Sequence, residues 1–250
     1  MVKVYIANVG VNRSDEKRGM MSPLFNDGTF EFVPIKEAKK SITDDMPTYS
    51  SLKSFNSDNL LATYLPEKIH EYHAHNDPEF ITFTYGDVTT NPRSYNLQKI
   101  EKGDYLFFLV RLTPYINNQF VRKEGGFYII GYLVVEGVYS TEEELKENKE
   151  KIKRNNHFIK YQHNKDDLGS FLVIKGDMQK SKRFIKPIKV DRIFCDRFLL
   201  DSKGQPFNWD EKKTENQIIG SYTRTIRANL DSEKYPEKTK QFLNFIEKQN

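Results

Sequence analysis

Two long apolar runs dominate the hydrophobic pattern of the chain, and a polar loop separates them. Residues 105–112 and 127–138 are apolar at nearly every position, which is typical of strands that are covered on both faces. A Gly-Asp turn at residues 103–104 leads into the first run. The two runs therefore predict neighbouring strands of a small, tightly closed β-barrel.

Shorter segments of the chain predict further strands. Residues 2–9 open the fold, and residues 29–33 alternate after an Asn-Asp-Gly turn and stop at Pro34. Residues 80–85 and 170–175 each end at a Gly-Asp pair. The pattern thus indicates a sheet whose strands come from both halves of the chain.

Two segments have the pattern of helices. Residues 140–154 are rich in Glu and Lys and begin with a capping-box pattern from Ser140 to Glu143. Residues 235–248 carry Phe242, Phe245 and Ile246 at helical spacing, which favours an amphipathic helix packed on the domain. Residues 36–61 are polar and predict loops with at most a short helix. We see no repeat, linker or domain boundary, so residues 1–250 are expected to form one α+β domain.

Composition limits the class of protein. The 250 residues have a net charge of +4, with 13% aromatic residues, which permits an acidic partner such as nucleic acid without requiring one. The single cysteine, Cys195, allows no intrachain disulfide and is expected to be a small buried apolar residue. The N-terminus lacks the pattern of a secretory signal, and no apolar run approaches the roughly 20 residues that span a bilayer. We therefore expect a cytoplasmic protein that does not enter the membrane.

A histidine-rich segment is the first candidate for chemistry. His73, His75 and Asp77 would share one face of a strand, and two imidazoles with a carboxylate are metal ligands in type. Pro78 argues against a regular strand here, however, and His-x-His pairs are common in loops. We expect a polar loop in which Asp77 caps a turn, and no metal.

Polar residues at strand ends are a second set of candidates. Asp87 follows Tyr85 at a strand end, where it would bind the edge of a base, act as a general base, or simply form a turn. Asn8 ends the first strand and offers both a donor and an acceptor. His157 follows the surface helix and would orient a ligand or titrate near neutral pH.

Basic residues supply candidate phosphate contacts. Lys182 and Arg183 precede Phe184, a mixture that suits phosphate binding combined with stacking, or else a solvated face. Arg224 and Arg227 lie three residues apart and would share one side of a helix. No P-loop, dinucleotide-binding glycine pattern or nucleophile elbow occurs in the sequence.

Part of the chain resembles the EVE and YTH branch of the PUA-like fold. The resemblance covers roughly residues 93–190. It depends on Arg93 and Asn96 ahead of Leu97, IEKGDYLFF at residues 100–108, IGY at 130–132, and residues 175–187. It implies a barrel cleft that accepts a flipped or modified base, lined by Tyr85, Asp87, Arg93 and Asn96. The only tryptophan, Trp209, lies outside the matching segment.

A second resemblance covers nearly the whole chain. SPLF at residues 22–25, DGTF at 27–30, FVPI at 32–35, DPEF at 77–80 and TYGD at 84–87 look like the third family of nucleotide-modification-associated domains. This resemblance implies a setting in systems that modify or restrict DNA bases, rather than one reaction.

The sequence thus predicts an α+β domain built on a PUA-like mixed β-barrel, with flanking helices and additional N-terminal strands. The leading hypothesis is a protein that binds nucleic acid or a nucleotide, with a modified base as target, in DNA modification or phage defence. One alternative is an enzyme acting on a nucleotide or base through His73, His75, Asp77 and Asp87. The other is an interaction subunit with protein partners in a defence complex. Catalysis and any cofactor remain open.

Overall fold

The computed structural model describes residues 1–38, 43–165, 170–201, 203–207, 209–210, 212–213 and 219–249, with the backbone alone at 221, 223, 227 and 228. The strands are β1 (Lys3–Asn8), β2 (Ser22–Leu24), β3 (Ile35–Lys36), β4 (Ala74–His75), β5 (Thr84–Val88), β6 (Tyr105–Ile116), β7 (Gln119–Phe120), β8 (Gly126–Tyr139), β9 (Phe171–Gly176), β10 (Lys182–Lys189) and β11 (Arg227–Asp231). The α-helices are α1 (Glu142–Glu147), α2 (Lys149–Ile152), α3 (Asn156–His163), α4 (Arg192–Phe198), α6 (Gly220–Arg224) and α7 (Pro236–Gln249).

A mixed sheet in the order β11-β1-β6-β8-β9-β5 organises these elements. β1 and β2 run parallel to β6, whereas the other pairs in the sheet are antiparallel. The long strand β8 bends, so that it pairs with β6 on one side and with β10 and then β9 on the other. Gly131 lies at this bend, where a Cβ atom would approach the carbonyl oxygen of Lys182 to 2.4 Å. A side chain is therefore excluded at the point where β8 and β10 pair.

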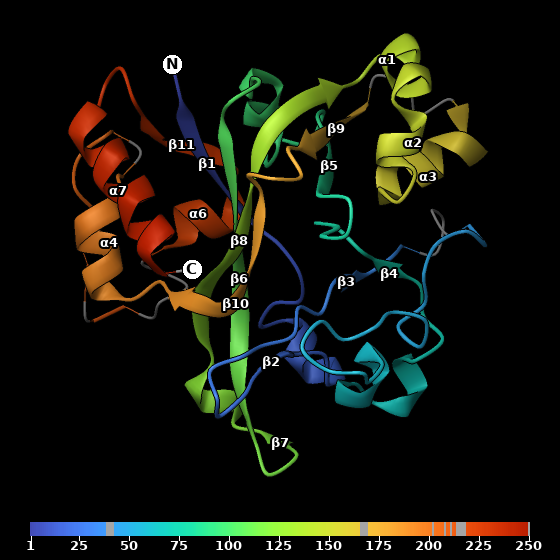
Figure 1. Cartoon of the computed structure of the whole chain (residues 1–250). Helices are drawn as coiled ribbons and strands as arrows, with labels where there is room; N and C mark the ends of the chain where they lie inside the picture. The colour runs from blue at the N-terminus through green and yellow to red at the C-terminus, as the bar shows by residue number, and fades with distance from the viewer. Residues whose placement is uncertain are drawn as a thin grey trace.

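Both faces of the central strands are buried, which explains their continuous apolar sequence. On β6, Phe107 and Leu109 face one core together with α4 and α7, while Phe108 and Val110 face a second core on the opposite side. Phe242 of α7 is fully buried against Phe107, with ring centroids 5.0 Å apart. Figure 1 shows α4, α6 and α7 gathered on one side of the sheet and α1, α2 and α3 at the far end of β8 and β9. The two apolar strands and the C-terminal amphipathic helix are confirmed, whereas the single helix expected over residues 140–154 is two short helices, α1 and α2.

Apart from β2, the described residues between β1 and β5 form a smaller layer beside the sheet. It contains the two-stranded sheet of β3 and β4, and the short 3-10 helices η1 (Asp15–Arg18), η3 (Leu61–Tyr64) and η4 (Glu67–Ile69). A core of its own holds this layer together, with Tyr49 fully buried. Figure 1 shows this layer beside the lower half of the sheet, next to the β6–β7 hairpin. The expectation of loops over residues 36–61 is confirmed for the described part of that range, and the short 3-10 helix η3 only begins at Leu61.

The structure corrects several boundaries. The sheet is not closed into a barrel over the described residues, so the PUA-like barrel is not confirmed although the α+β class is. Residues 29–33 pair only through an isolated antiparallel bridge between Leu24 and Phe30 and do not form a longer strand. The hydroxyl of Ser22 accepts the Val33 N–H, so the pairing stops there. The helix at residue 140 begins one residue later than expected, with Thr141 and Glu144 forming the capping box.

Two further expectations fail for local reasons. Residues 80–83 form a turn, because the Glu79 carboxylate accepts the N–H groups of Ile81 and Thr82, and the strand starts only at Thr84. Arg224 ends α6 while Arg227 begins β11, so the two residues do not share a helix. No helix within the described ranges has both the length and the apolar character needed to cross a bilayer.

Candidate functional site

A small polar cavity brings together six of the thirteen residues that the sequence nominated. This polar cleft has a volume of about 170 Å³. It is lined by Asn8, Val9, Gly10, Asn12, Ile35, His75, Asp77, Tyr85, Gly86, Asp87 and Arg93. The residues come from the end of β1, from β4 and from β5, which the sheet and the smaller layer place side by side.

His75 is held in a defined orientation at the polar cleft. Its Nδ1 lies 2.7 Å from Oε2 of Glu37, and Nζ of Lys160 lies 2.8 Å from the same oxygen. Burial would raise the pKa of Glu37, but the hydrogen bonds and charges of His75 and Lys160 outweigh it and lower the pKa to about 2. Because an ionised carboxylate only accepts, Nδ1 of His75 is the donor of this hydrogen bond.

Asp77 and His157 are buried beside His75. Oδ2 of Asp77 accepts the Gly86 N–H at 2.8 Å and lies 3.9 Å from Nε2 of His157. Burial raises the pKa of Asp77 well above its ordinary value, opposed by the Gly86 hydrogen bond and reinforced by the charge of Asp87. Burial also lowers the pKa of His157, so its imidazole is neutral. We call His75, Asp77 and His157 the histidine cluster.

Gly86 makes this cluster possible. A Cβ atom at residue 86 would lie 2.6 Å from Cδ2 of His157 and 2.9 Å from Oδ1 of Asn155. Asn155 caps α3, because its Oδ1 accepts the N–H groups of His157 and Phe158. The TYGD motif therefore carries a glycine where α3 packs closest to β5.

Three residues expected to bind a base, Tyr85, Asp87 and Arg93, line the polar cleft in different environments. Tyr85 is buried, packs its ring on Phe108, and reaches the cleft through a hydroxyl that donates to Asp87 at 2.8 Å. A guanidinium nitrogen of Arg93 donates to the carbonyl oxygen of Asn8. Since the Tyr85 ring is covered, the polar cleft offers hydrogen bonds but no stacking surface.

The remaining nominated residues lie elsewhere. Asn96 donates to the Ile226 carbonyl at 2.9 Å and lines a different cavity. His73 turns toward the Met46 carbonyl, 3.0 Å from its Nδ1, and does not join the histidine cluster. Lys182 and Arg224 are exposed, and the side chain of Arg227 lies outside what the structure describes.

Arg183 is buried rather than displayed. Its guanidinium lies over the rings of Phe55 and Phe30, at 3.6 and 4.7 Å from the ring centroids. It also lies 3.5 Å from Oε2 of Glu31, whose oxygens accept the N–H groups of Phe55 and Asn56. The position of Arg183 is thus explained by an internal ion pair.

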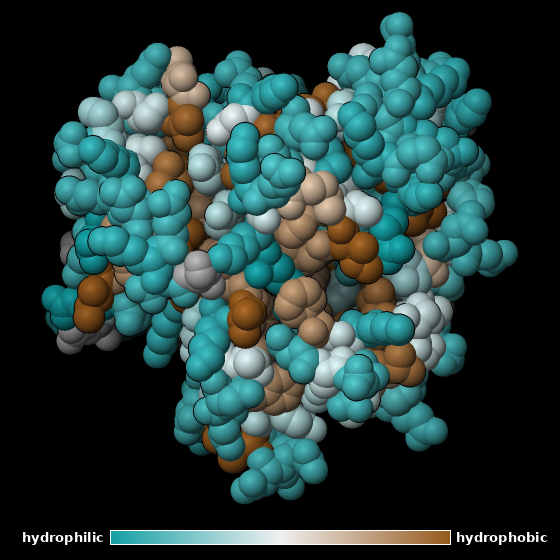
Figure 2. Space-filling view, viewed as in Figure 1, coloured by the Kyte–Doolittle hydropathy of each residue, from teal (hydrophilic) through white to brown (hydrophobic). Residues whose placement is uncertain are grey.

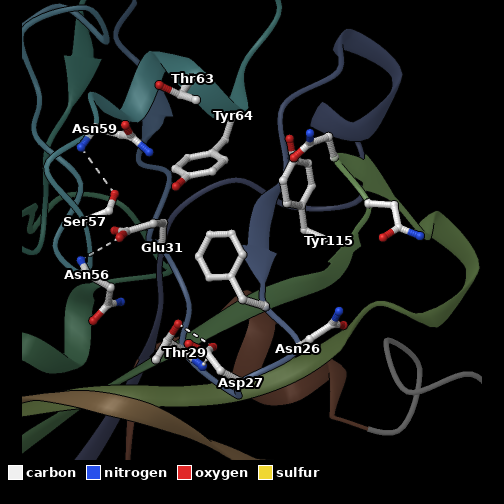
Figure 3. A pocket seen from close by; sticks show the side chains of 13 residues that line it. Asn26, Asp27, Thr29, Glu31, Asn56, Ser57, Asn59, Thr63, Tyr64 and Tyr115 are labelled. Atoms are coloured by element: carbon white, nitrogen blue, oxygen red, sulfur yellow. Dashed lines mark hydrogen bonds between the residues drawn. The ribbon is translucent and has the colours of Figure 1, made fainter.

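A second, larger cavity was not foreseen from the sequence. Phe25, Tyr64 and Tyr115 converge there, with ring centroids 5.4 to 6.0 Å apart. This aromatic cavity has a volume of about 560 Å³. It is lined by Phe25, Asn26, Asp27, Thr29, Glu31, Asn56, Ser57, Asn59, Thr63, Tyr64, Tyr115, Asn117 and Asn118. Figure 3 shows Asn56, Ser57 and Asn59 along one side and Tyr115 on the other.

The rings of the aromatic cavity come from distant parts of the chain. Phe25 follows β2, Tyr64 ends η3 and Tyr115 lies near the end of β6. All three are half-buried. Apart from Phe25, the lining of the aromatic cavity is hydrophilic, and Figure 2 shows that the visible face is largely hydrophilic, with hydrophobic residues gathered near its middle. No local sequence signal marks the cavity, although Phe25 belongs to the SPLF motif.

The polar lining of the aromatic cavity consists of amides and carboxylates. Among the described residues, no protein hydrogen bond involves the side-chain amides of Asn26 or Asn59. Hydrogen bonds from Thr29 lower the pKa of Asp27, with a contribution from the charge of Lys186. The lining residues include no Lys or Arg, and Lys186 approaches from the rim beside Gly28.

A family model, nucleotide modification associated domain 3, matches residues 3–204 of the chain. The chain belongs to this family. No curated protein and no solved structure matched it. The matched residues of this nucleotide modification associated domain include the whole lining of both cavities, whereas α6, β11 and α7 lie outside the match. Membership points to a role in nucleotide-modification systems, and the EVE-like and YTH-like resemblance is not confirmed.

Proposed function

We propose that this domain binds a nucleotide or a nucleic-acid strand by holding one base in the aromatic cavity. The observation that carries the proposal is the convergence of Phe25, Tyr64 and Tyr115 beside side-chain amides. Stacking of a base on an aromatic ring contributes about 1–3 kcal/mol. Amides supply the paired donor and acceptor that match the edge of a base.

Size and charge favour the base over the phosphate in this cavity. Its volume of about 560 Å³ lies within the roughly 300–1,000 Å³ of ordinary ligand pockets. The carboxylate of Asp27 makes the lining negative, which repels phosphate and accepts amino groups of a base, whereas the charge of Glu31 is compensated by Arg183. Phosphate would therefore stay at the rim, near Lys186. A modified base and a setting in DNA modification or phage defence are part of this proposal, because the family is associated with nucleotide modification.

An enzyme acting on a nucleotide or base is the second candidate. The observation that favours it is the histidine cluster, in which two imidazoles and a buried carboxylate adjoin Asp87 in the polar cleft. Perturbed pKa values of buried titratable groups are concentrated at functional sites, although structural networks show them too. The two candidates are compatible, since one cavity would bind and the other would react.

Fluorescence-anisotropy and calorimetric titrations test the binding proposal. Single- and double-stranded oligonucleotides and free nucleosides, both unmodified and base-modified, would be titrated at low and moderate salt. We expect Tyr64→Ala to weaken binding at least about tenfold, from the loss of one stacking surface. Tyr95→Ala is the matched control, because Tyr95 is 56% exposed and lies outside the aromatic cavity. No binding to any probe, or equal effects of the two variants, would contradict the proposal.

A further inference from the structure

We infer that His75, Asp77 and His157 bind a divalent transition-metal ion at the wall of the polar cleft. One ligand atom from each of these three side chains lies within 4.8 Å of the others. They come from β4, from the loop before β5 and from α3, so the fold, rather than a local motif, assembles the set. The sequence grouped His73 with His75 and Asp77, but in the structure the second histidine of the set is His157.

Asp77 has an oxygen atom available for a ligand. Its Oδ2 accepts the Gly86 N–H at 2.8 Å and faces Nδ2 of Asn155 at 3.4 Å. Its Oδ1 is buried and has no hydrogen-bond partner among the described residues, while the residue is only 5% exposed. A buried acceptor that lacks a partner is costly to keep. A metal ion beside the two imidazoles would supply the missing interaction.

His75 has the outer-sphere partner that metal-binding histidines usually have. Its Nδ1 donates to Glu37 at 2.7 Å, which leaves Nε2 as the ligand atom. Carboxylates in this position fix the ring and raise the basicity of the imidazole. Lys160 secures Glu37 in turn at 2.8 Å. The orientation of His75 is therefore set before any ligand arrives.

His157 is held from several sides. The ring lies edge-on to that of His75 at a centroid distance of 5.0 Å, and stacks on Phe171 at 5.9 Å. Asn155 fixes the backbone at the start of α3, and Gly86 leaves room for the ring. These contacts fix the orientation of the imidazole before a metal binds.

The ligand types select the class of ion. Two imidazoles and one carboxylate suit Zn²⁺, Fe²⁺ or Mn²⁺-type chemistry, whereas Mg²⁺ and Ca²⁺ prefer oxygen ligands throughout. With metal–ligand distances of about 2.0–2.2 Å, the three ligand atoms must draw closer together on binding. Three protein ligands leave coordination positions open for water or substrate. Asp87 and Arg93 line the same cleft as His75 and Asp77, so they are the residues that a bound substrate would meet.

The test is metal binding by the full-length protein after treatment with EDTA. Zn²⁺ would be titrated calorimetrically, and Co²⁺ would be followed by its visible absorption as a report on coordination. We expect one Zn²⁺ per chain, a raised melting temperature, and a Co²⁺ spectrum with nitrogen ligands. Mg²⁺ should not compete. His75→Ala and Asp77→Asn should each remove most of the affinity, and Glu37→Gln should weaken it by roughly 10–100-fold.

His73→Ala is the matched control, because His73 lies two residues from His75 but contacts the Met46 carbonyl instead. Its Zn²⁺ affinity should equal that of the unaltered protein, and circular dichroism would confirm that each variant is folded. Failure to bind Zn²⁺ or Co²⁺, or an equal loss in His73→Ala, would overturn the inference. No nucleotide is present in these measurements, so their failure is distinct from failure of base binding.

Discussion

The aromatic cavity and the histidine cluster illustrate two ways of building a site on one sheet. The cavity is wide and half-buried, and its members contribute flat rings and amides. The cluster is enclosed, and its members are titratable groups whose orientation depends on Glu37, Gly86 and Asn155. The difference teaches how the two proposed roles would be divided: shape would support recognition in the first region, and fixed geometry and charge would support chemistry in the second. Changes to one region should therefore leave the other intact.

The largest effect is expected from Arg183→Met. This substitution leaves Glu31 buried without its cationic partner and removes the ring contacts with Phe55 and Phe30. Removing one partner of a buried ion pair lowers the free energy of unfolding by about 3–5 kcal/mol. We expect a value of about 3 kcal/mol, because two backbone N–H groups still donate to the Glu31 carboxylate in the variant. Denaturant unfolding measures it. Nucleoside binding should also weaken, because Glu31 lines the aromatic cavity.

Arg224→Met is the control for Arg183→Met. Arg224 is exposed at the end of α6, and surface substitutions usually change stability by less than about 0.5 kcal/mol. An equal loss of stability in the two variants would contradict the internal role of Arg183.

Gly86→Ala should have the next largest effect. The added methyl group would overlap the ring of His157 and the capping amide of Asn155, and such overpacking costs about 1–3 kcal/mol. Thermal unfolding and Zn²⁺ titration measure the damage to the histidine cluster, while nucleoside affinity should not change. In the control Gly220→Ala, the nearest atom to the new methyl is the flexible end of Arg224 at 3.2 Å. That variant should unfold like the unaltered protein.

Tyr115→Leu should act on recognition alone. Leucine retains apolar contact with Phe25 but removes a ring from the aromatic cavity, so we expect a loss of about 1 kcal/mol in base binding. Calorimetry with a nucleoside measures it, and Zn²⁺ affinity is the internal control. A change in Zn²⁺ affinity would show that the two regions are not independent.

The smallest effect is expected at the rim. Lys186 lies beside Gly28 and Asp27, so Lys186→Ala should weaken binding of a nucleotide by about 0.5 kcal/mol and leave nucleoside binding unchanged. The effect should fade as salt rises. Lys189→Ala, on the same strand, is the matched control. If nucleoside binding also weakens, Lys186 acts on something other than phosphate.

Much of the sheet could be predicted from the sequence. The apolar runs of β6 and β8 and the helical spacing of Phe242 and Ile246 report burial directly, and the structure confirms both. The same pattern does not distinguish a closed barrel from an open sheet. Strands that are buried on both faces are apolar at nearly every position in either architecture. The turn at residues 80–83 was missed because the Glu79 side chain, rather than local propensity, determines it.

The polar cleft could be predicted in part from the sequence, whereas the aromatic cavity could not. The sequence identified four polar residues at or near strand ends as candidates, because functional side chains are often displayed there. The structure brings these four, His75, Asp77, Asp87 and Asn8, to one cleft. Phe25, Tyr64 and Tyr115 gave no such signal, because aromatic residues in an aromatic-rich chain are expected in any core. Their convergence depends on contacts between residues that lie far apart in the sequence.

The location of the bound base is the most direct test of the central claim. A crystal structure of the protein soaked with the tightest-binding nucleoside would show it. The account predicts a base lying against Phe25, Tyr64 or Tyr115, with its edge facing the amides of Asn26 or Asn59. A base seated at Asp87 and Arg93 instead, with the aromatic cavity holding only solvent, would contradict it.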